Sequence, residues 1–310
     1  MWTITPSQIL AAVVLDVLLG DPRGWPHIAR ITGALALFYE RILTARFARS
    51  VRLGIAFWLL VSGTIFAGYA ALFFLCRTLH VEWALNVFIV YQSIAARDLM
   101  RHALAVWRPL RIGQLDGARA KLAWIVGRDT AGLDEHEISR AAVESVAEST
   151  CDGIIAPLFW AALAGAPGAL LYRVANTLDS MVGHRDARYE RFGKASARID
   201  DLLNLLPSRL TALCYSCLNR FQHWKKIRRE AVAHASPNAG WPEAAMAYAL
   251  DVRLGGTNSY GGIHHPAPSF HTDGRRPHPS DIPRSLRAMW NATAIAVALL
   301  LAALILFRSR

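Results

Sequence analysis

The chain has 310 residues, of which 54% are hydrophobic and 18% are charged, and its mean hydropathy is +0.25. A soluble domain is roughly 25% charged, so this composition excludes an ordinary soluble protein, a disordered chain and a small disulfide scaffold. The net charge of +11, from 34 Lys and Arg against 23 Asp and Glu, would suggest a nucleic-acid partner for a soluble protein. In a membrane protein, basic residues concentrate in the segments on the cytoplasmic side, so the excess indicates topology instead. We therefore expect an all-α integral membrane protein that contacts lipid and no nucleic acid.

Four apolar segments predict transmembrane helices. Residues 57–76 form the clearest span, because twenty residues without a charge cover roughly 30 Å of hydrocarbon as a helix. Residues 289–307 form the last span, and residues 4–19 and 83–96 are weaker candidates, the second of which pairs with 57–76 as a helical hairpin. No basic segment precedes residues 4–19, so we expect a retained span there rather than a cleaved signal peptide.

Two further apolar stretches, residues 154–172 and 202–218, contain helix-breaking residues, including Pro167 and Pro207. Four segments hold 30 of the 34 basic residues, namely 20–54, 97–153, 173–201 and 219–287. If both apolar stretches crossed the membrane, the 173–201 segment would lie on the side opposite the others. The positive-inside rule therefore favours broken helices that do not cross fully. It predicts a multi-pass protein of the inner membrane, with about four spans and a cytoplasmic or membrane-associated catalytic part over 97–287.

A stripe of charged residues precedes the first broken stretch. Asp134 and Glu137 have the spacing of a capping box, which predicts the start of a helix. Four charged residues then recur every fourth position on one face of that helix: Arg140, Glu144, Glu148 and Asp152. The stripe is either a solvated helix face or a functional site. It runs directly into an apolar segment, which places Asp152 at the membrane surface and favours the functional interpretation.

Two more acidic motifs flank the apolar stretches. Asn176 and Asp179 lie three residues apart and so share a helix face, where they offer hard oxygen ligands for Mg²⁺. Asp200 and Asp201 stand at the mouth of the 202–218 stretch, where paired acids near a low dielectric need a cation. We expect the two motifs to face each other across a metal-bridged phosphate. The alternative for the first motif is an ordinary helix cap formed by Asp179 or Ser180.

The segment 236–243 and two glycine pairs complete the polar motifs. Ser236 or Asn238 could cap a helix that has Pro242 in its first turn. The pairs Gly255-Gly256 and Gly261-Gly262 could let backbone N–H groups approach an anion, although the sequence contains no Walker A, GxGxxG or HExxH motif.

Four segments taken together resemble the CobD/CbiB family of cobalamin biosynthesis: Leu15 to Gly33, Glu144 to Trp160, Gly165 to Leu213, and His234 to Ala247. The resemblance covers nearly the whole chain in the family's order. It implies a membrane-bound adenosylcobinamide-phosphate synthase. That enzyme uses ATP and Mg²⁺ to join the free propionate of adenosylcobyric acid, through an amide bond, to aminopropanol or aminopropanol phosphate.

This chemistry assigns roles to the polar motifs. A carboxylate becomes an acyl donor after ATP activates it, so the site needs Mg²⁺ ligands, cations for phosphate and a base for the amine. We expect Asp179, Asp200 and Asp201 to bind the metal, and four further residues to bind the cofactor: Asn176, Ser180, Arg198 and Asn238. Glu144 or Glu148 is the expected base, with Asp152 beside them.

Three other functions remain open at this stage. The membrane signalling family AmpE shares part of the pattern, so fold alone does not settle function. An intramembrane Mg²⁺-dependent prenyltransferase would use similar acidic motifs but should carry them between many full spans. A transporter should show inverted repeats, which are not visible in the sequence. As a synthase, the chain would also be expected to associate with other membrane enzymes of the corrinoid pathway.

Overall fold

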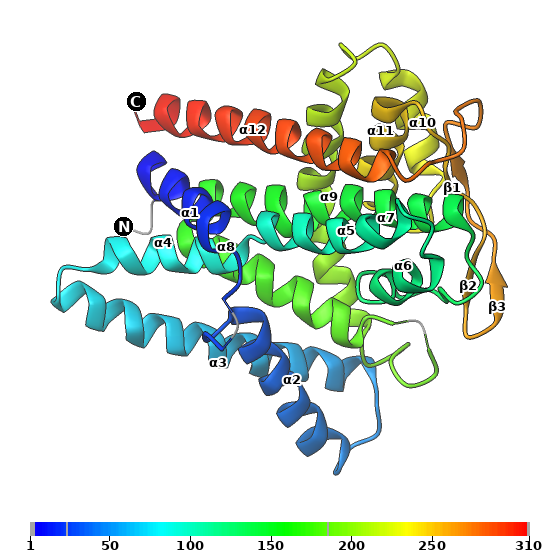
Figure 1. The fold of residues 1–310 in the computed structure, drawn as a ribbon. Helices are drawn as coiled ribbons and strands as arrows, with labels where there is room; N and C mark the ends of the chain where they lie inside the picture. The colour runs from blue at the N-terminus through cyan, green and yellow to red at the C-terminus, as the bar shows by residue number, and fades with distance from the viewer. Residues whose placement is uncertain (1–3, 23, 185, 309–310) are drawn as a thin grey trace. The chain divides into compact units, whose positions relative to one another are not determined.

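The computed structural model describes residues 4–22, 24–184 and 186–308, which are mostly helical (Figure 1). The chain divides into two compact units. Unit 1 comprises the described residues of 1–95, 156–204 and 300–310, and unit 2 comprises residues 96–155 and 205–299. The prediction of a helical membrane protein with several spans is confirmed.

Unit 1 is built around helix α8, which packs against α2, α3 and α4, while α1 packs against α4. The first helix begins with a capping box between Thr5 and Gln8, and Pro6 occupies its first position directly after Thr5. The unit contains α1 (Pro6–Leu19), α2 (Ile28–Thr44), α3 (Val51–Thr78), α4 (Glu82–Ser93), α8 (Ala156–Val182) and the first part of α9 (Lys194–Cys217).

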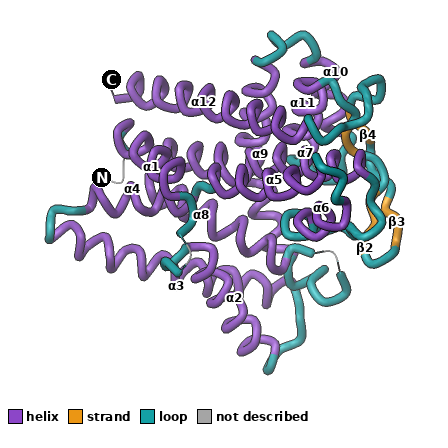
Figure 2. The backbone as a smooth tube through the Cα atoms, in the orientation of Figure 1, coloured by secondary structure: helices purple, strands orange, loops and turns teal. Residues whose placement is uncertain are grey.

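In unit 2, helix α7 is the buried centre, and it packs against α5, α6 and α11. The helices are α5 (Ala96–Leu110), α6 (Leu115–Leu122), α7 (Glu135–Thr150), α10 (Trp224–Val232), α11 (Gly240–Leu250) and most of α12 (Asp281–Arg308), with a π-helical turn at Cys151–Ile155. Figure 2 shows the short strands, which form two antiparallel pairs. The first pair is β1 (Leu254–Gly255) with β4 (Ser269–Phe270), and the second is β2 (Asn258–Tyr260) with β3 (Ile263–His265). The capping box predicted at Asp134 and Glu137 starts α7 and is confirmed.

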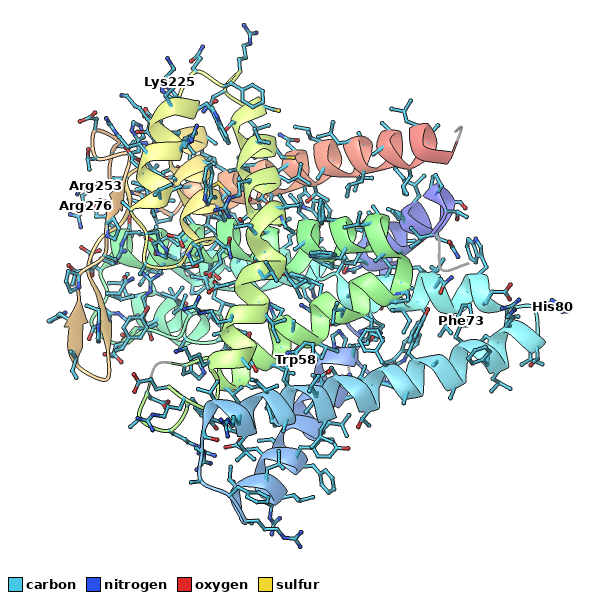
Figure 3. All side chains as sticks on the ribbon, turned by 180° about the vertical axis from the view of Figure 1, so that it is seen from behind. Trp58, Phe73, His80, Lys225, Arg253 and Arg276 are labelled. Atoms are coloured by element: carbon cyan, nitrogen blue, oxygen red, sulfur yellow. The ribbon has the colours of Figure 1, made fainter. Side chains whose placement is uncertain are left out.

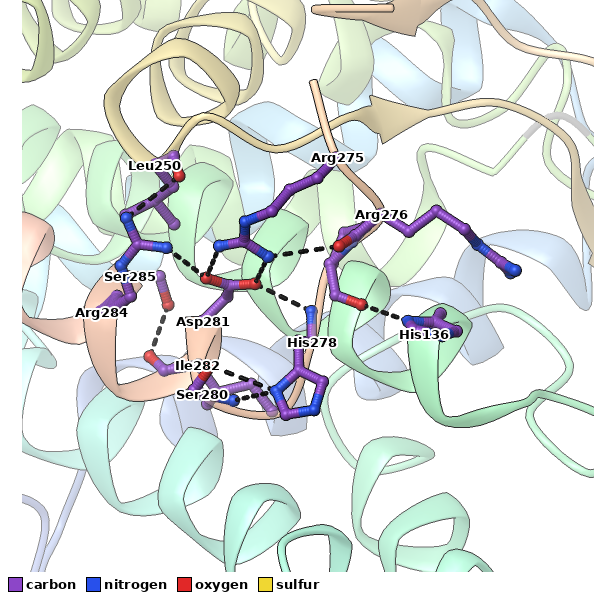
Figure 4. Close-up of polar contacts among 11 residues, drawn as sticks. His136, Leu250, Arg275, Arg276, His278, Ser280, Asp281, Ile282, Arg284 and Ser285 are labelled. Carbon is purple, nitrogen blue, oxygen red and sulfur yellow. Dashed lines mark hydrogen bonds and ion pairs between the residues drawn. The ribbon is translucent and has the colours of Figure 1, made fainter. Parts of the chain in front are cut away.

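The start of α12 is fixed by an ion-pair cluster around a buried carboxylate (Figure 4). The carboxylate of Asp281, which is fully buried, accepts hydrogen bonds from Arg275 at 2.6 and 2.7 Å and from Arg284 at 2.6 Å. It also accepts the backbone N–H of His278 at 2.8 Å. The segment rich in proline and histidine that precedes the last helix is thereby tied to the first turn of α12.

Three helical runs are long and apolar enough to cross a membrane: Val51–Thr78, Glu135–Val182 and Asp281–Leu306. The first and third contain the predicted spans 57–76 and 289–307. Only 22% of the most apolar window of α3 is buried within the protein, which suits a helix that faces lipid. Figure 3 labels Trp58 and Phe73 on this helix and His80 in the turn that follows it. Helices α1 and α4 have 14 and 12 residues, so the spans 4–19 and 83–96 stay predictions.

The second run, Glu135–Val182, includes the stretch 154–172 that we did not count as a span. Its backbone does break, at Ala164 (φ −128°) and Gly165 (φ 71°), next to Pro167. Of its most apolar 18-residue window, 61% is buried within the protein, so this part of the run is largely enclosed by other elements.

The break predicted at Pro207 is wrong, because α9 continues through that residue. A proline within a helix leaves the carbonyl four residues earlier without its N–H partner. Here that carbonyl belongs to Leu203, and it accepts a hydrogen bond from the indole Nε1 of Trp160 at 2.9 Å. The substitute donor removes much of the penalty for continuing the helix.

Candidate active site

An acidic cluster in unit 1 is centred on Asp200, whose side chain is 9% exposed. Its Oδ1 accepts a hydrogen bond from Asn176 Nδ2 at 3.4 Å, and its Oδ2 accepts one from Asn204 Nδ2 at 3.0 Å. The buried hydroxyl of Tyr172 donates to Asn204 Oδ1 at 2.9 Å and fixes the orientation of that amide. The structure therefore brings together the motifs predicted around Asn176 and Asp200, on α8 and α9.

The electrostatics of this cluster favour a cation. Burial and the negative charge of Asp179 raise the pKa of Asp200 to about 7, although hydrogen bonds from Asn176 and Asn204 oppose the shift. A carboxylate whose proton affinity is raised by a neighbouring carboxylate offers a place for a positive ion. Gly183 lies against Asp179, because a Cβ at position 183 would overlap the Asp179 carboxylate.

A cavity of about 680 Å³ opens next to this cluster, entirely within unit 1. Two acidic residues line it, Glu190 and Asp201, together with three basic residues: Arg191, Lys194 and Arg198. Successive residues of a helix point about 100° apart, so Asp200 turns toward the amides while Asp201 turns toward the cavity. The cavity thus combines two carboxylates with three cations, a composition that suits a metal-bound polyphosphate.

The donor set fits Mg²⁺, within limits set by the geometry. Carboxylate and amide oxygens are its preferred protein ligands, and it usually keeps waters and substrate phosphates in addition to one or two carboxylates. In the described part of the chain, no three His, Cys, Asp or Glu side chains converge as a ready-made metal site. Asp179, Asp200 and Asp201 accordingly do not form a closed three-carboxylate cage, and their role as metal ligands stays a prediction.

A buried ion-pair network in unit 2 surrounds Glu144, whose side chain is 5% exposed. Its Oε2 accepts a hydrogen bond from Arg128 at 2.6 Å. Its Oε1 accepts one from Arg140 at 3.1 Å and one from the backbone N–H of Gly255 at 2.7 Å. Three donors hold this carboxylate in place, two of them guanidinium groups, and this arrangement favours a positioning role for Glu144 over that of a base.

Glu148 and Asp152 follow along the same helical run, Glu148 exposed and Asp152 half-buried in the π-helical turn. Irregular turns of this kind occur often at functional sites. Glu148 is accessible where Glu144 is enclosed, so it is the better placed of the two predicted bases.

The other predicted cofactor residues have partners of their own. The hydroxyl of Ser180, which is exposed, donates to the carbonyl of Asn176 at 2.9 Å. Asn238 is buried in unit 2, and its Oδ1 accepts a hydrogen bond from Arg209 at 2.7 Å. Asn238 does not cap α11, whose first turn has no side-chain cap.

The four N–H groups of the glycine pairs already have acceptors within the protein, three of them carboxylate oxygens. Gly255 donates its N–H to Glu144, and Gly256 donates to the carbonyl of Pro268 at 3.1 Å. Gly261 and Gly262 both donate to the carboxylate of Asp129, at 3.0 and 2.8 Å. The expectation that these N–H groups are available to a ligand is therefore wrong.

Comparison with known proteins places the chain in a family. The family model described as "CobD/Cbib protein" matches residues 9–289. The cobalamin biosynthesis protein CbiB of Salmonella typhimurium is 42% identical over 304 residues, which cover 94% of this chain and 95% of the relative. The cobalamin biosynthesis protein CobD of Klebsiella pneumoniae is 42% identical over 299 residues, or 93% and 94% of the two chains. The chain belongs to the CobD/CbiB family. The assignment to cobalamin biosynthesis made from the sequence is confirmed. No solved structure matches the chain.

Sequence reasoning did not single out several residues that the structure of this CobD/CbiB protein places in or beside the candidate clusters. Glu243, on α11, is 9% exposed. Burial and the charges of Glu144 and Glu148 raise the pKa of Glu243 well above its usual range, although Arg128 and Arg140 oppose the shift. A buried carboxyl with a raised pKa holds its proton more tightly than an exposed glutamate, which suits a hydrogen-bond donor.

Glu243 lies in the segment His234 to Ala247, whose resemblance to the family could have drawn attention to it. The acidic residues that it meets, Glu144 and Glu148, lie about a hundred residues earlier in the chain. For Arg128 and Lys194 no sequence signal distinguished them from the many other basic residues.

Proposed function

We propose that this chain catalyses ATP-dependent amide-bond formation, as the adenosylcobinamide-phosphate synthase of cobalamin biosynthesis. Its carboxylate substrate would be the free propionate of adenosylcobyric acid, and its amine substrate aminopropanol or aminopropanol phosphate. The observation that carries the proposal is the buried acidic cluster around Asp200, next to a cavity lined by cations, in a member of the CobD/CbiB family.

In this proposal the unit 1 cavity binds the nucleotide. Its volume of about 680 Å³ lies within the roughly 300–1,000 Å³ of typical ligand pockets. Arg191, Lys194 and Arg198 would neutralise phosphate oxygens, while Asp179 and Asp200 would hold Mg²⁺ with Asp201 at the cavity wall. When bound, the metal would supply a Lewis acid that withdraws charge from the reacting phosphate.

The unit 2 network would serve the amine. The nucleophile must lose a proton as the amide forms, and the exposed Glu148 is the side chain proposed to accept it. Glu144 would hold Arg128 and Arg140 in place as a positioning residue. Glu243, whose raised pKa favours its protonated form, is a second group that could donate a hydrogen bond beside them.

We also place the catalytic loops on the cytoplasmic side of the inner membrane, where ATP is available. The support is the concentration of 30 of the 34 basic residues in four segments that the positive-inside rule assigns to one side. The surface of such an enzyme would be open to other membrane enzymes of the corrinoid pathway, which would supply or consume its substrates.

The test is a reconstituted assay. The protein in lipid nanodiscs is supplied with adenosylcobyric acid, ATP, Mg²⁺ and either aminopropanol or its phosphate, and the corrinoid product is detected by mass spectrometry. We expect product from the wild type and a loss of at least a hundredfold in kcat/KM for Asp200→Asn, because a metal or phosphate ligand contributes several kcal/mol to the transition state.

Asp116→Asn is the matched control, since that carboxylate is 97% exposed and lies outside both clusters. A wild type that forms no nucleotide-dependent amide would refute the synthase and favour an AmpE-like signalling protein. An active Asp200→Asn variant would refute the assignment of the acidic cluster.

A further inference from the structure

A second cavity, of about 280 Å³, lies entirely within unit 2 between the start of α7 and the strand β1. Three arginines line it: Arg140, Arg253 and Arg276. Its one lining carboxylate, Glu137, is turned to the helix cap, where it accepts the backbone N–H of Asp134 at 3.1 Å. The cavity is therefore strongly cationic.

The three arginines differ in how many of their donors are already used. Arg140 is 13% exposed and is committed to Glu144 and to backbone carbonyls of the β1–β2 segment. Arg276 makes one ion pair, at 3.2 Å, with the half-exposed Asp134. The guanidinium of Arg253 has no partner among the residues that the structure describes.

The backbone holds Arg253 and Arg276 next to each other. Val252 pairs with Arg275 in a parallel bridge, and the N–H of Arg253 donates to the carbonyl of Arg275 at 2.8 Å. Arg253 and Arg276 directly follow these paired residues, and both line the cavity. Figure 3 shows the two arginines close together. The Arg276 guanidinium points away from the Asp281 cluster (Figure 4), so that cluster does not consume it.

We propose that Arg253 and Arg276 form a binding site for the phosphate group of a small phosphomonoester. Two guanidinium groups with unused donors match the several acceptor oxygens of a phosphate dianion, which arginine binds in a bidentate manner. The cavity is smaller than the unit 1 cavity and falls below the range that accommodates a drug-sized ligand, so a small molecule suits it better than a whole nucleotide.

Two sources could supply the phosphate, and both rest on the proposed synthase function: a phosphorylated amine substrate, or the phosphate released from ATP. The site adjoins the Glu144 network through Arg140 and Gly255, which belong to both. A phosphate held here would therefore anchor its molecule beside the residues proposed to serve the amine.

Direct binding is measured first, by titrating inorganic phosphate and aminopropanol phosphate into nanodisc-embedded protein in a calorimeter. We expect Arg253→Gln to weaken binding of either ligand about tenfold to a hundredfold, the effect of losing one hydrogen bond to a charged group. Arg253→Lys should retain part of the affinity that Arg253→Gln loses. Arg253 has no described intramolecular partner, so its replacement should leave the fold intact. Arg228→Gln, an exposed arginine on α10, is the matched control and should bind as the wild type does.

Kinetics then distinguish the sources. A rise in KM for aminopropanol phosphate in Arg253→Gln and Arg276→Gln, with KM for ATP and for unphosphorylated aminopropanol unchanged, would assign the site to the amine substrate. Weaker inhibition by inorganic phosphate with all KM values unchanged would assign it to the released phosphate. Phosphate binding equal to that of wild type in both variants would overturn the site, and this result stands whether or not the protein proves to be a synthase.

Discussion

Replacing Glu144 with glutamine tests the ion-pair network of unit 2. The side chain is buried between two guanidinium groups that are themselves only 11% and 13% exposed. Glutamine keeps the shape and one acceptor, but it removes the charge and directs an N–H₂ group at an arginine. Breaking a buried pair by neutralising one partner costs about 3–5 kcal/mol, because the remaining charges stay buried without compensation. For a chain of this size the loss corresponds to a fall in melting temperature on the order of 10 °C.

The assay is thermal unfolding in nanodiscs, followed by intrinsic tryptophan fluorescence. Glu148→Gln is the matched control, since Glu148 lies one turn further along the same helix and is exposed, so its replacement should change the free energy of unfolding by less than about 1 kcal/mol. The double variant Arg128→Met with Glu144→Gln should recover part of the loss, with a coupling of about 1–3 kcal/mol. Equal melting temperatures for the two single glutamine variants would show that the network around Glu144 does not exist.

Three further predictions concern unit 1. Mg²⁺ should raise the melting temperature of the wild type and leave that of Asp200→Asn unchanged; the same Mg²⁺ shift in both proteins would show that Asp200 does not take part in metal binding. Gly183→Ala should raise the Mg²⁺ concentration needed for half-maximal activity about tenfold to a hundredfold, because the new methyl group displaces the Asp179 carboxylate; an unchanged requirement would mean that the position of Asp179 is immaterial. Glu40 is buried, and although burial itself opposes the shift, hydrogen bonds from Arg49 and Arg188 hold its pKa below the usual 4.5. The ionised Glu40 therefore stabilises the fold fully above pH 4.5, and this contribution is lost as the pH falls through the lowered pKa. Glu40→Gln removes the titrating group, so it should weaken the acid dependence of the free energy of unfolding. Parallel stability curves for the two proteins between pH 7 and acid would contradict this.

Local sequence patterns predicted those features whose cause is local. The uncharged segment within α3 and the capping box of α7 depend on residues within a few positions of one another, and both are present. The proximity of Asn176 and Asp200 was also predictable, because both motifs border apolar stretches and both carry oxygen atoms that can ligate a metal.

Features that depend on distant partners could not be predicted. Helix α9 runs through Pro207 because an indole 43 residues before Leu203 supplies the missing donor. Gly255 appeared available to a ligand, but Glu144, 111 residues earlier, takes its N–H. In each case the residue was singled out but its behaviour was predicted wrongly, because its partner lay too far away in the sequence to be identified.

The run Glu135–Val182 shows why the candidate sites lie where they do. It is apolar enough to cross a membrane, yet it contributes Glu144 to the network of unit 2 and Asn176 with Asp179 to the cluster of unit 1. Polar and charged side chains in such a run are costly to bury unless other groups satisfy them. The structure supplies those groups as arginines, amides and backbone N–H donors. A helix that served only as an anchor would need none of them, so the polar residues of this run are best explained by chemistry at its surface.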